Sequence, residues 1–192
     1  MNALTRPTTM AAEGRPRWRW TLHDIERMAA AGLFRDGDRA ELIGGELVPM
    51  SPMGNHHEHL RTELTFALTK LCPDHLRVAS EPQFNLAEDD YRQPDILVYE
   101  AARRIHDVRG PTALLVIEIA DSNFDHDTGA KALAYAGFGV RDYWVIDAKT
   151  RRTRVFREPT ANGFTAQADV AADAVMTPLL VPELAVSLSR IG

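Results

Sequence analysis

Two apolar segments constrain the fold of this chain more than any other feature. The segments 94–100 (PDILVYE) and 112–120 (TALLVIEIA) are apolar at odd and even positions alike. Strands with this pattern are typical of the centre of a sheet that helices cover on both faces. The sequence therefore predicts an α/β fold in which these two segments are central strands.

The N-terminal half shows helical and hairpin patterns. A first helix is predicted from Thr21, and a tight hairpin is predicted where two short alternating segments flank Gly44 and Gly45. A second helix is predicted with Asn55 as its N-cap, and Arg61 of this helix is expected to point outward. The expected buried stripe of this helix comprises His57, Leu60, Leu64, Leu68 and Leu71.

Further strands and one helix are predicted in the remainder of the chain. Residues 77–86 (RVASEPQFNL) alternate as one strand, 141–147 and 152–158 form a strand pair, and 178–191 forms a short closing strand. The helix predicted between them, over 125–138, is expected to bury Ala130, Leu133, Ala134 and Phe138. This order indicates a mixed β-sheet flanked by helices. Repeated βαβ units and a phosphate-binding glycine loop are both absent from the sequence, so a Rossmann or P-loop fold has no support.

The formal net charge of −5 limits the function classes. A protein that holds nucleic acid tightly usually has a basic surface, so this charge argues against a constitutive, high-affinity DNA-binding protein. A nuclease remains compatible with it, because its active site gathers carboxylates and metal ions supply positive charge. The one dense basic stretch, Lys149 to Arg157, is interpreted as a solvated hairpin with alternating charges.

Cysteine usage and the N-terminal sequence favour a cytoplasmic domain. Cys72 is the only cysteine, which argues against a secreted disulfide scaffold. No apolar run approaches the roughly 20 residues of a membrane span, and residues 1–17 lack the apolar region of a signal peptide. Residues 1–16 are expected to form a flexible arm, and 17–192 one domain.

Two carboxylates lie in the predicted central strands. Asp95 opens the first strand, and Glu118 lies within the apolar run of the second. An unpaired buried charge is strongly unfavourable, and either a metal ion or a salt bridge to an arginine or lysine would neutralise it. Two carboxylates with a backbone carbonyl such as that of Ile119 would provide the hard oxygen ligands that Mg²⁺ or Mn²⁺ prefers.

Lys131 lies in the helix predicted after the Glu118 strand. From there its ammonium group could point back to the strand end, where it would orient or deprotonate a metal-bound water or stabilise charge on a phosphate. The alternative is a solvated helix lysine, and both interpretations stay open.

These residues resemble the PD-(D/E)XK nuclease pattern. Pro94-Asp95 and Glu118 match it, but Ala120 stands where the usual pattern has lysine. This departure is similar to a branch in which the lysine has moved to the next helix, here Lys131. With ELIGGELVPMSPMGNHH, LLVIEIADSN and YAGFGVRDYWVID in the same order and spacing, nearly the whole chain resembles the Uma-type family of restriction endonucleases.

The resemblance implies a restriction-endonuclease-like core and a metal-dependent endonuclease. Such an enzyme would use metal-activated water to hydrolyse phosphodiester bonds of nucleic acid, and DNA is the expected substrate rather than RNA. Asp95 and Glu118 would bind Mg²⁺ or Mn²⁺, and Lys131 would take the role of the migrated lysine. Dimers are common among nucleases of this fold, so a homodimer is also expected. The alternative is a nuclease-like module that binds nucleic acid or protein without cleaving.

Glu46, His57 and Glu81 match polar positions near such sites and are weaker candidates. Each has a structural alternative. Glu46 would be a strand-edge charge, His57 a hydrogen-bonded core histidine on an apolar helix face, and Glu81 a charge on the polar side of its strand.

Overall fold

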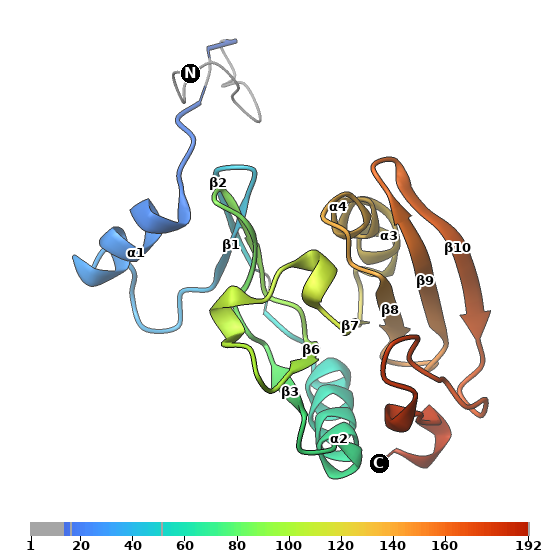
Figure 1. The fold of residues 1–192 in the computed structure, drawn as a ribbon. Coiled ribbons are helices and arrows are strands. Elements are labelled where there is room, and N and C mark those ends of the chain that lie inside the picture. The colour runs from blue at the N-terminus through green and yellow to red at the C-terminus, as the bar shows by residue number, and fades with distance from the viewer. Residues whose placement is uncertain (1–13, 16, 51, 192) are drawn as a thin grey trace. The chain divides into compact units, whose positions relative to one another are not determined.

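The computed structural model describes residues 14–15, 17–50 and 52–191, in two compact units (Figure 1). Unit 1 comprises Met1–Pro52 and Gln83–Gln93, and unit 2 comprises Met53–Pro82 and Pro94–Gly192. The arm predicted for residues 1–16 lies outside the described residues, apart from Gly14 and Arg15. That arm and the single domain over 17–192 stay predictions.

Unit 1 contains a helix and a four-stranded sheet. The helix α1 (Leu22–Ala30) begins after Thr21, whose hydroxyl accepts a hydrogen bond from the backbone N–H of Asp24, which confirms the predicted start. The predicted hairpin is also confirmed, with positive φ at Gly44 and Gly45. The strand order is β2 (Glu46–Pro49), β1 (Ala40–Ile43), β5 (Asp90–Arg92) and β4 (Phe84–Ala87).

Unit 2 is built on a six-stranded sheet, which is mixed as the sequence predicts. The strands β7 and β8 are parallel, and the other neighbours are antiparallel. Every residue of β7 is buried, which fits a central strand. The strand order is β10 (Gly163–Val170), β9 (Thr153–Thr160), β8 (Asp142–Asp147), β7 (Leu115–Ala120), β6 (Ile96–Glu100) and β3 (Leu76–Ser80).

Helices cover both faces of this sheet. The helix α2 (Asn55–Leu71) packs on β3 and β7, and α4 (Ala132–Gly137) packs on β9 and β10 (Figure 1). Leu60, Leu64 and Leu68 of α2 join Ile117 and Trp144 in one apolar core with the C-terminal segment. Because side chains alternate along a strand, the neighbours of Ile117 and Trp144 in β7 and β8 point to the opposite face.

The start and the buried face of α2 differ from the prediction in two respects. Its N-cap is Gly54, not Asn55, and no side chain caps it. A Cβ atom at Gly54 would collide with the carboxylate of Asp121, so a larger residue here would require the Asp121 side chain to move. Leu71, predicted on the buried stripe, is 47% exposed because the helix ends there and passes the edge of the core.

Two predicted strands are wrong. Residues 77–86 do not form one strand, because the chain turns at Glu81, where φ is +50°, and continues from β3 into a strand of the other sheet. Residues 178–191 form 3-10 turns, η5 (Pro182–Leu184) and η6 (Leu188–Arg190), rather than a closing strand. Pro178 and Pro182 lack the backbone N–H that a strand ladder needs.

The helix predicted over 125–138 is present, but its buried face is not the predicted one. It comprises α3 (Phe124–His126), a π-helical turn η4 (Asp127–Lys131) and α4. Leu133 is 51% exposed and Ala130 is exposed, whereas Tyr135 is fully buried. A π turn adds a residue to the helical repeat and so rotates the residues after it relative to those before it.

Candidate active site

The register of β6 and β7 brings the two predicted carboxylates to the same end of the sheet. Ile96 pairs with Ile117 in this antiparallel ladder, so Asp95, directly before β6, falls beside Glu118. Their exposed fractions are 7% for Asp95 and 4% for Glu118. The strand pairing therefore places two buried carboxylates next to each other.

Asp95 is held by a histidine and by the backbone of β7. Its Oδ1 lies 2.8 Å from Nε2 of His57, which stands on the buried stripe of α2 as predicted. Its Oδ2 accepts a 2.6 Å hydrogen bond from the backbone N–H of Ile119. The Nδ1 atom of His57 is buried without a hydrogen-bond partner among the described residues. His57 thus contacts Asp95 through Nε2, and its Nδ1 atom makes no hydrogen bond among the described residues.

Glu118 is bound by two groups from the helical segment that follows β7. The hydroxyl of Tyr135 donates a 2.9 Å hydrogen bond to Oε1 of Glu118, and Nζ of Lys131 lies 3.1 Å from the same oxygen. The Lys131 side chain is 11% exposed. Lys131 is therefore not a solvated helix lysine, and it points back to the strand end as the first interpretation required.

Asp127 is a third buried carboxylate at this site, for which the sequence suggested no role. Its Oδ1 lies 3.6 Å from Nζ of Lys131, and its backbone carbonyl accepts a 2.9 Å hydrogen bond from the hydroxyl of Tyr143. Burial raises the pKa of Asp127, and the positive charge of Lys131 opposes that rise. The available sequence signal was the i, i+4 spacing of Asp127 and Lys131, which brings side chains together on a helix.

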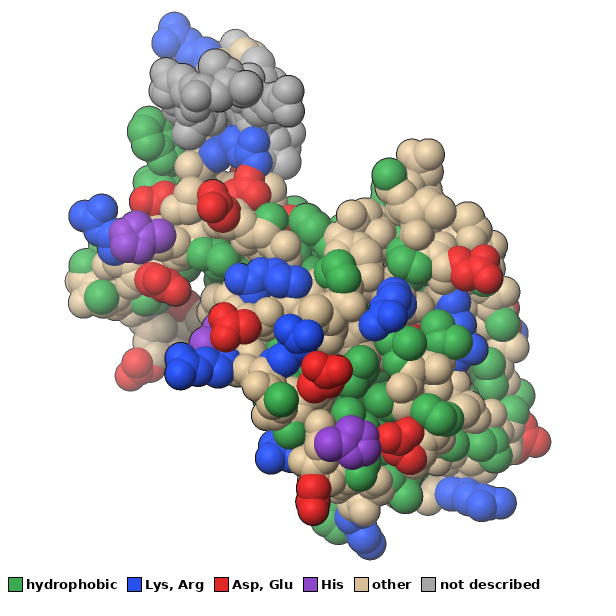
Figure 2. All heavy atoms as spheres, in the orientation of Figure 1, with side chains coloured by type: hydrophobic (Ala, Val, Ile, Leu, Met, Phe, Trp, Pro, Cys, Tyr) green, Lys and Arg blue, Asp and Glu red, His purple; other side chains and the backbone are tan. Residues whose placement is uncertain are grey.

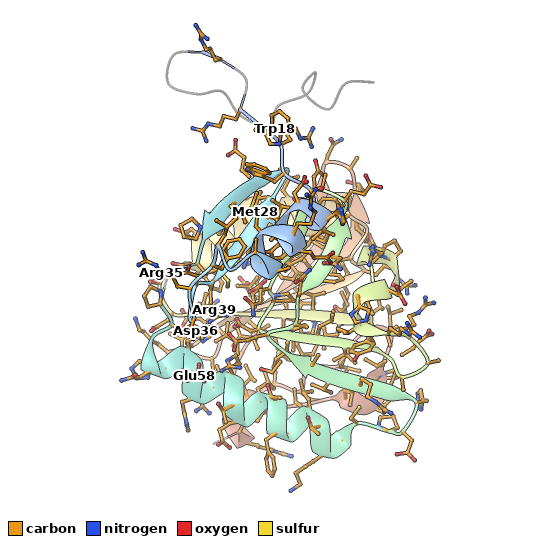
Figure 3. All side chains as sticks on the ribbon, turned by 90° about the vertical axis from the view of Figure 1, so that its left-hand side faces the viewer. Trp18, Met28, Arg35, Asp36, Arg39 and Glu58 are labelled. Atoms are coloured by element: carbon orange, nitrogen blue, oxygen red, sulfur yellow. The ribbon has the colours of Figure 1, made fainter. Side chains whose placement is uncertain are left out.

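Glu81 lies beside Asp95 through its backbone rather than its carboxylate. The N–H of Glu81 donates a 3.0 Å hydrogen bond to the carbonyl of Asp95. The carboxylate of Glu81 lies 3.1 Å from Arg61, which also pairs with Glu58. Glu58 lies on the first turns of α2 (Figure 3). Arg61 was predicted to point outward, but its side chain is only 12% exposed because these two carboxylates enclose it.

Glu46 belongs to unit 1 and is described there. It begins β2, directly after the hairpin, and its carboxylate lies 3.3 Å from Arg17. This contact is that of a strand-edge charge, and a functional role for Glu46 stays a prediction.

The basic residues of 149–157 are largely neutralised by neighbouring carboxylates. Arg154 lies 2.8 Å from Asp169, and Lys149 lies 3.1 Å from Asp121. On the face drawn in Figure 2, basic and acidic side chains are intermingled. This arrangement agrees with the interpretation of the stretch as a hairpin with alternating charges.

The carboxylate oxygens of Asp95 and Glu118 are the type of ligand that a magnesium ion prefers. Among residues 14–15, 17–50 and 52–191, no three His, Cys, Asp or Glu side chains are grouped as a metal site. Mg²⁺ does not need such a cage, because it commonly binds one or two carboxylates and keeps several waters. The unpaired Nδ1 of buried His57 also indicates polar capacity that the described side chains leave unmet. Two carboxylates with water, and the carbonyl of Ile119 that the sequence suggests as a further ligand, would make a chemically suitable set.

The mixed sheet with helices on both faces makes this an α/β protein, and the buried carboxylates and lysine at one end of the sheet fit the restriction-endonuclease-like class. Residues 22–189 match the profile of the Uma2 family, described as "Putative restriction endonuclease". The chain belongs to the Uma2 family, as its resemblance implied.

A solved structure from Anabaena variabilis, titled a "putative nuclease belonging to DUF820", has a similar fold. The TM-score is 0.69 at 19% sequence identity, over 88% of this chain and 95% of that one. At this identity the similarity concerns the fold alone. A comparison with curated proteins found no match.

Proposed function

We propose that this protein is a metal-dependent endonuclease that hydrolyses phosphodiester bonds in nucleic acid. The observation that carries the proposal is the convergence of Glu118, Lys131 and Asp95 at one end of the sheet, where Lys131 lies 3.1 Å from Glu118. Asp95 and Glu118 would hold Mg²⁺ or Mn²⁺, together with the carbonyl of Ile119. Membership of the Uma2 family supports the same reaction class.

The residues would divide the chemistry between them. A bound divalent cation supplies Lewis acidity and makes water a better nucleophile at neutral pH. In the reaction, the water oxygen bonds to phosphorus and loses one proton to solvent, the bond to the leaving oxygen breaks, and the leaving oxygen takes up a proton from solvent. Lys131 would stabilise the negative charge that develops on the phosphate, and His57 and Tyr135 would hold the two carboxylates in place.

The proposal is tested with purified protein and three substrates: plasmid DNA, single-stranded DNA and RNA. Each is incubated with Mg²⁺, Mn²⁺ or EDTA, and products are separated on gels. Cleavage that requires metal is expected, with DNA cut faster than RNA. Metal binding without cleavage of any substrate would favour the alternative, a nuclease-like module that only binds. If neither metal binding nor cleavage occurs, the proposed function fails.

Two finer expectations belong to the same proposal. A homodimer would allow two sites to act on two strands, and light scattering after size-exclusion chromatography measures its mass. A reducing compartment such as the cytoplasm fits the single, half-buried Cys72. Within the described part of the chain, no helix is long and apolar enough to cross a membrane.

Replacing Lys131 by alanine is expected to lower kcat by about 100-fold or more, the usual effect of removing a group that assists the chemical step. The Kd for Mg²⁺, measured by calorimetry, should change much less, because lysine is not a ligand. Lys70→Ala, at an exposed position near the end of α2, is the matched control and should behave as wild type. Equal turnover in both variants would remove Lys131 from the mechanism.

A further inference from the structure

Lys131 lies between two buried carboxylates, although one would neutralise it. Its Nζ is 3.1 Å from Oε1 of Glu118 and 3.6 Å from Oδ1 of Asp127. The exposed fractions of the side chains are 5% for Glu118, 8% for Asp127 and 11% for Lys131. Burial of a second carboxylate is unfavourable, so its presence beside an already paired lysine calls for a function.

The backbone holds Asp127 firmly in this position. It begins the π turn η4, and π turns inside α-helices occur frequently at functional sites. The hydroxyl of Tyr143, from the buried strand β8, donates a hydrogen bond to the backbone carbonyl of Asp127. The ring centroids of Tyr143 and Tyr135 are 4.9 Å apart. The same pair of tyrosines therefore supports the Asp127 backbone and, through Tyr135, the Glu118 carboxylate.

The two carboxylates differ in what else they can do. Glu118 lies at the strand end beside Asp95 and is the proposed metal ligand. Once Glu118 donates electron density to a cation, its attraction for the Lys131 ammonium weakens, because a nearby positive charge repels that ammonium. Asp127 lies on the same helical segment as Lys131, four residues earlier, so its contact with Lys131 does not depend on Glu118.

We propose that Asp127 is a positioning residue that retains Lys131 at the active site when Glu118 is engaged by a divalent cation. This inference rests on the proposed function, since it assigns Glu118 to the metal and Lys131 to the reaction. Glu118 holds Lys131 in the metal-free protein, and Asp127 holds it in the loaded one. Asp127 touches neither substrate nor metal in this role.

The first test needs no metal and no activity. Glu118→Gln removes the charge of Glu118, as engagement by a cation would, and keeps an oxygen that accepts from Tyr135. The reactivity of Lys131 toward acetic anhydride is measured by mass spectrometry in wild type, Glu118→Gln, Asp127→Asn and the double variant, with exposed Lys70 as the internal reference. Circular dichroism establishes that each variant is folded.

These four proteins form a double-mutant cycle. The acetylation rate of Lys131 in Glu118→Gln is expected to stay within about threefold of the wild-type rate. In the double variant, the rate is expected to be at least about tenfold higher than in wild type. If Glu118→Gln alone makes Lys131 as reactive as the double variant, Asp127 does not hold the lysine and the inference is overturned. Should the double variant not fold, the single Glu118→Gln decides, because reactivity there equal to that of Lys70 overturns the inference.

The second test uses the metal-loaded protein. Asp127→Asn is expected to lower kcat by roughly 10- to 100-fold, as a misplaced catalytic group does, with KM and the Kd for Mg²⁺ nearly unchanged. Asp127→Glu, which restores the charge, should recover part of this loss, and Asp125→Asn, at an exposed position on the same segment, should be neutral. Wild-type turnover in Asp127→Asn would overturn the inference, whereas absence of cleavage by wild type would refute the proposed function and leave the first test to decide.

Discussion

Replacing Glu118 by glutamine is expected to abolish metal-dependent cleavage while leaving the fold intact. Glutamine has the shape of glutamate and keeps an oxygen that accepts the hydrogen bond of Tyr135. It lacks the negative charge that holds a divalent cation, whose stabilisation of the transition state amounts to several kcal/mol. Since about 1.4 kcal/mol corresponds to a factor of ten, the expected loss in rate is on the order of 1,000-fold or more.

The measurement compares cleavage rates and Mg²⁺ affinity in Glu118→Gln and in a matched control. Glu100→Gln is that control, because Glu100 ends the neighbouring strand β6 but is exposed and pairs with Arg103. Thermal unfolding should show both variants within a few degrees of wild type. A Glu118→Gln protein that cuts like Glu100→Gln would refute the assignment of Glu118, whereas loss of cleavage with a collapse in Tm would indicate a structural ion pair instead.

The same reasoning extends to Asp95, with a different secondary effect. Asp95 also binds Nε2 of His57 and the N–H of Ile119. Its removal would therefore leave a buried imidazole and a strand-end amide without their acceptor. Glu118 is the better position for the test, because a glutamine there can still accept the hydrogen bond from the hydroxyl of Tyr135.

The fold was predictable from sequence in those segments where the pattern of apolar residues follows directly from which side chains are buried. The apolar segments of β6 and β7 are typical of central strands, and the stripe of Leu60, Leu64 and Leu68 is typical of a helix face that packs on a core; both are observed. The strand β10 was not predicted, although Phe164, Ala166, Ala168 and Val170 alternate with polar residues, because two of the four are small alanines and none of its residues is fully buried. Its place at the sheet edge is set by pairing with β9, which is a tertiary contact.

Local backbone conformations were the second source of error. Glu81 adopts a left-handed φ of +50° before Pro82, which glutamate rarely does, and this turn sends the chain into another sheet. The π turn over Asp127–Lys131 has no recognised sequence signature. The face predicted for Leu133 was consequently wrong, since regular helical periodicity was assumed across the turn.

The candidate site was predictable in its carboxylates and lysine but not in its supports. Asp95 and Glu118 are conspicuous because they are charges in apolar strands, and the pairing of β6 with β7 brings them together. Asp127 and Tyr135 lie in an alanine-rich helix, where polar residues usually face solvent. Only the three-dimensional arrangement reveals that both point at Glu118 or Lys131.

Asp142 is expected to show the opposite behaviour from Glu118, with a large loss of stability on substitution. It is 1% exposed, and its oxygens accept hydrogen bonds from three protein donors. The carboxylate therefore stabilises the fold through these contacts. The donors are Nε1 of Trp144 at 3.0 Å, Nε of Arg157 at 3.0 Å and the backbone N–H of Leu179 at 2.6 Å.

Asp142→Ala leaves the Arg157 charge and two N–H groups without an acceptor and unties the C-terminal segment from β8. Breaking a buried ion pair from one side costs about 3–5 kcal/mol; because the Arg157 side chain is 32% exposed, we expect about the lower end of that range and a fall in Tm of roughly 6–12 °C for a chain of this length. Calorimetry measures the loss against Asp173→Ala, which removes an exposed aspartate of the same segment and should leave Tm unchanged. Equal Tm values for the two variants would mean that the Asp142 contacts contribute nothing net. A large difference, together with a Glu118→Gln protein that keeps its Tm and loses cleavage, would establish that burial of a carboxylate in this sheet has two separate causes, structure at Asp142 and chemistry at Glu118.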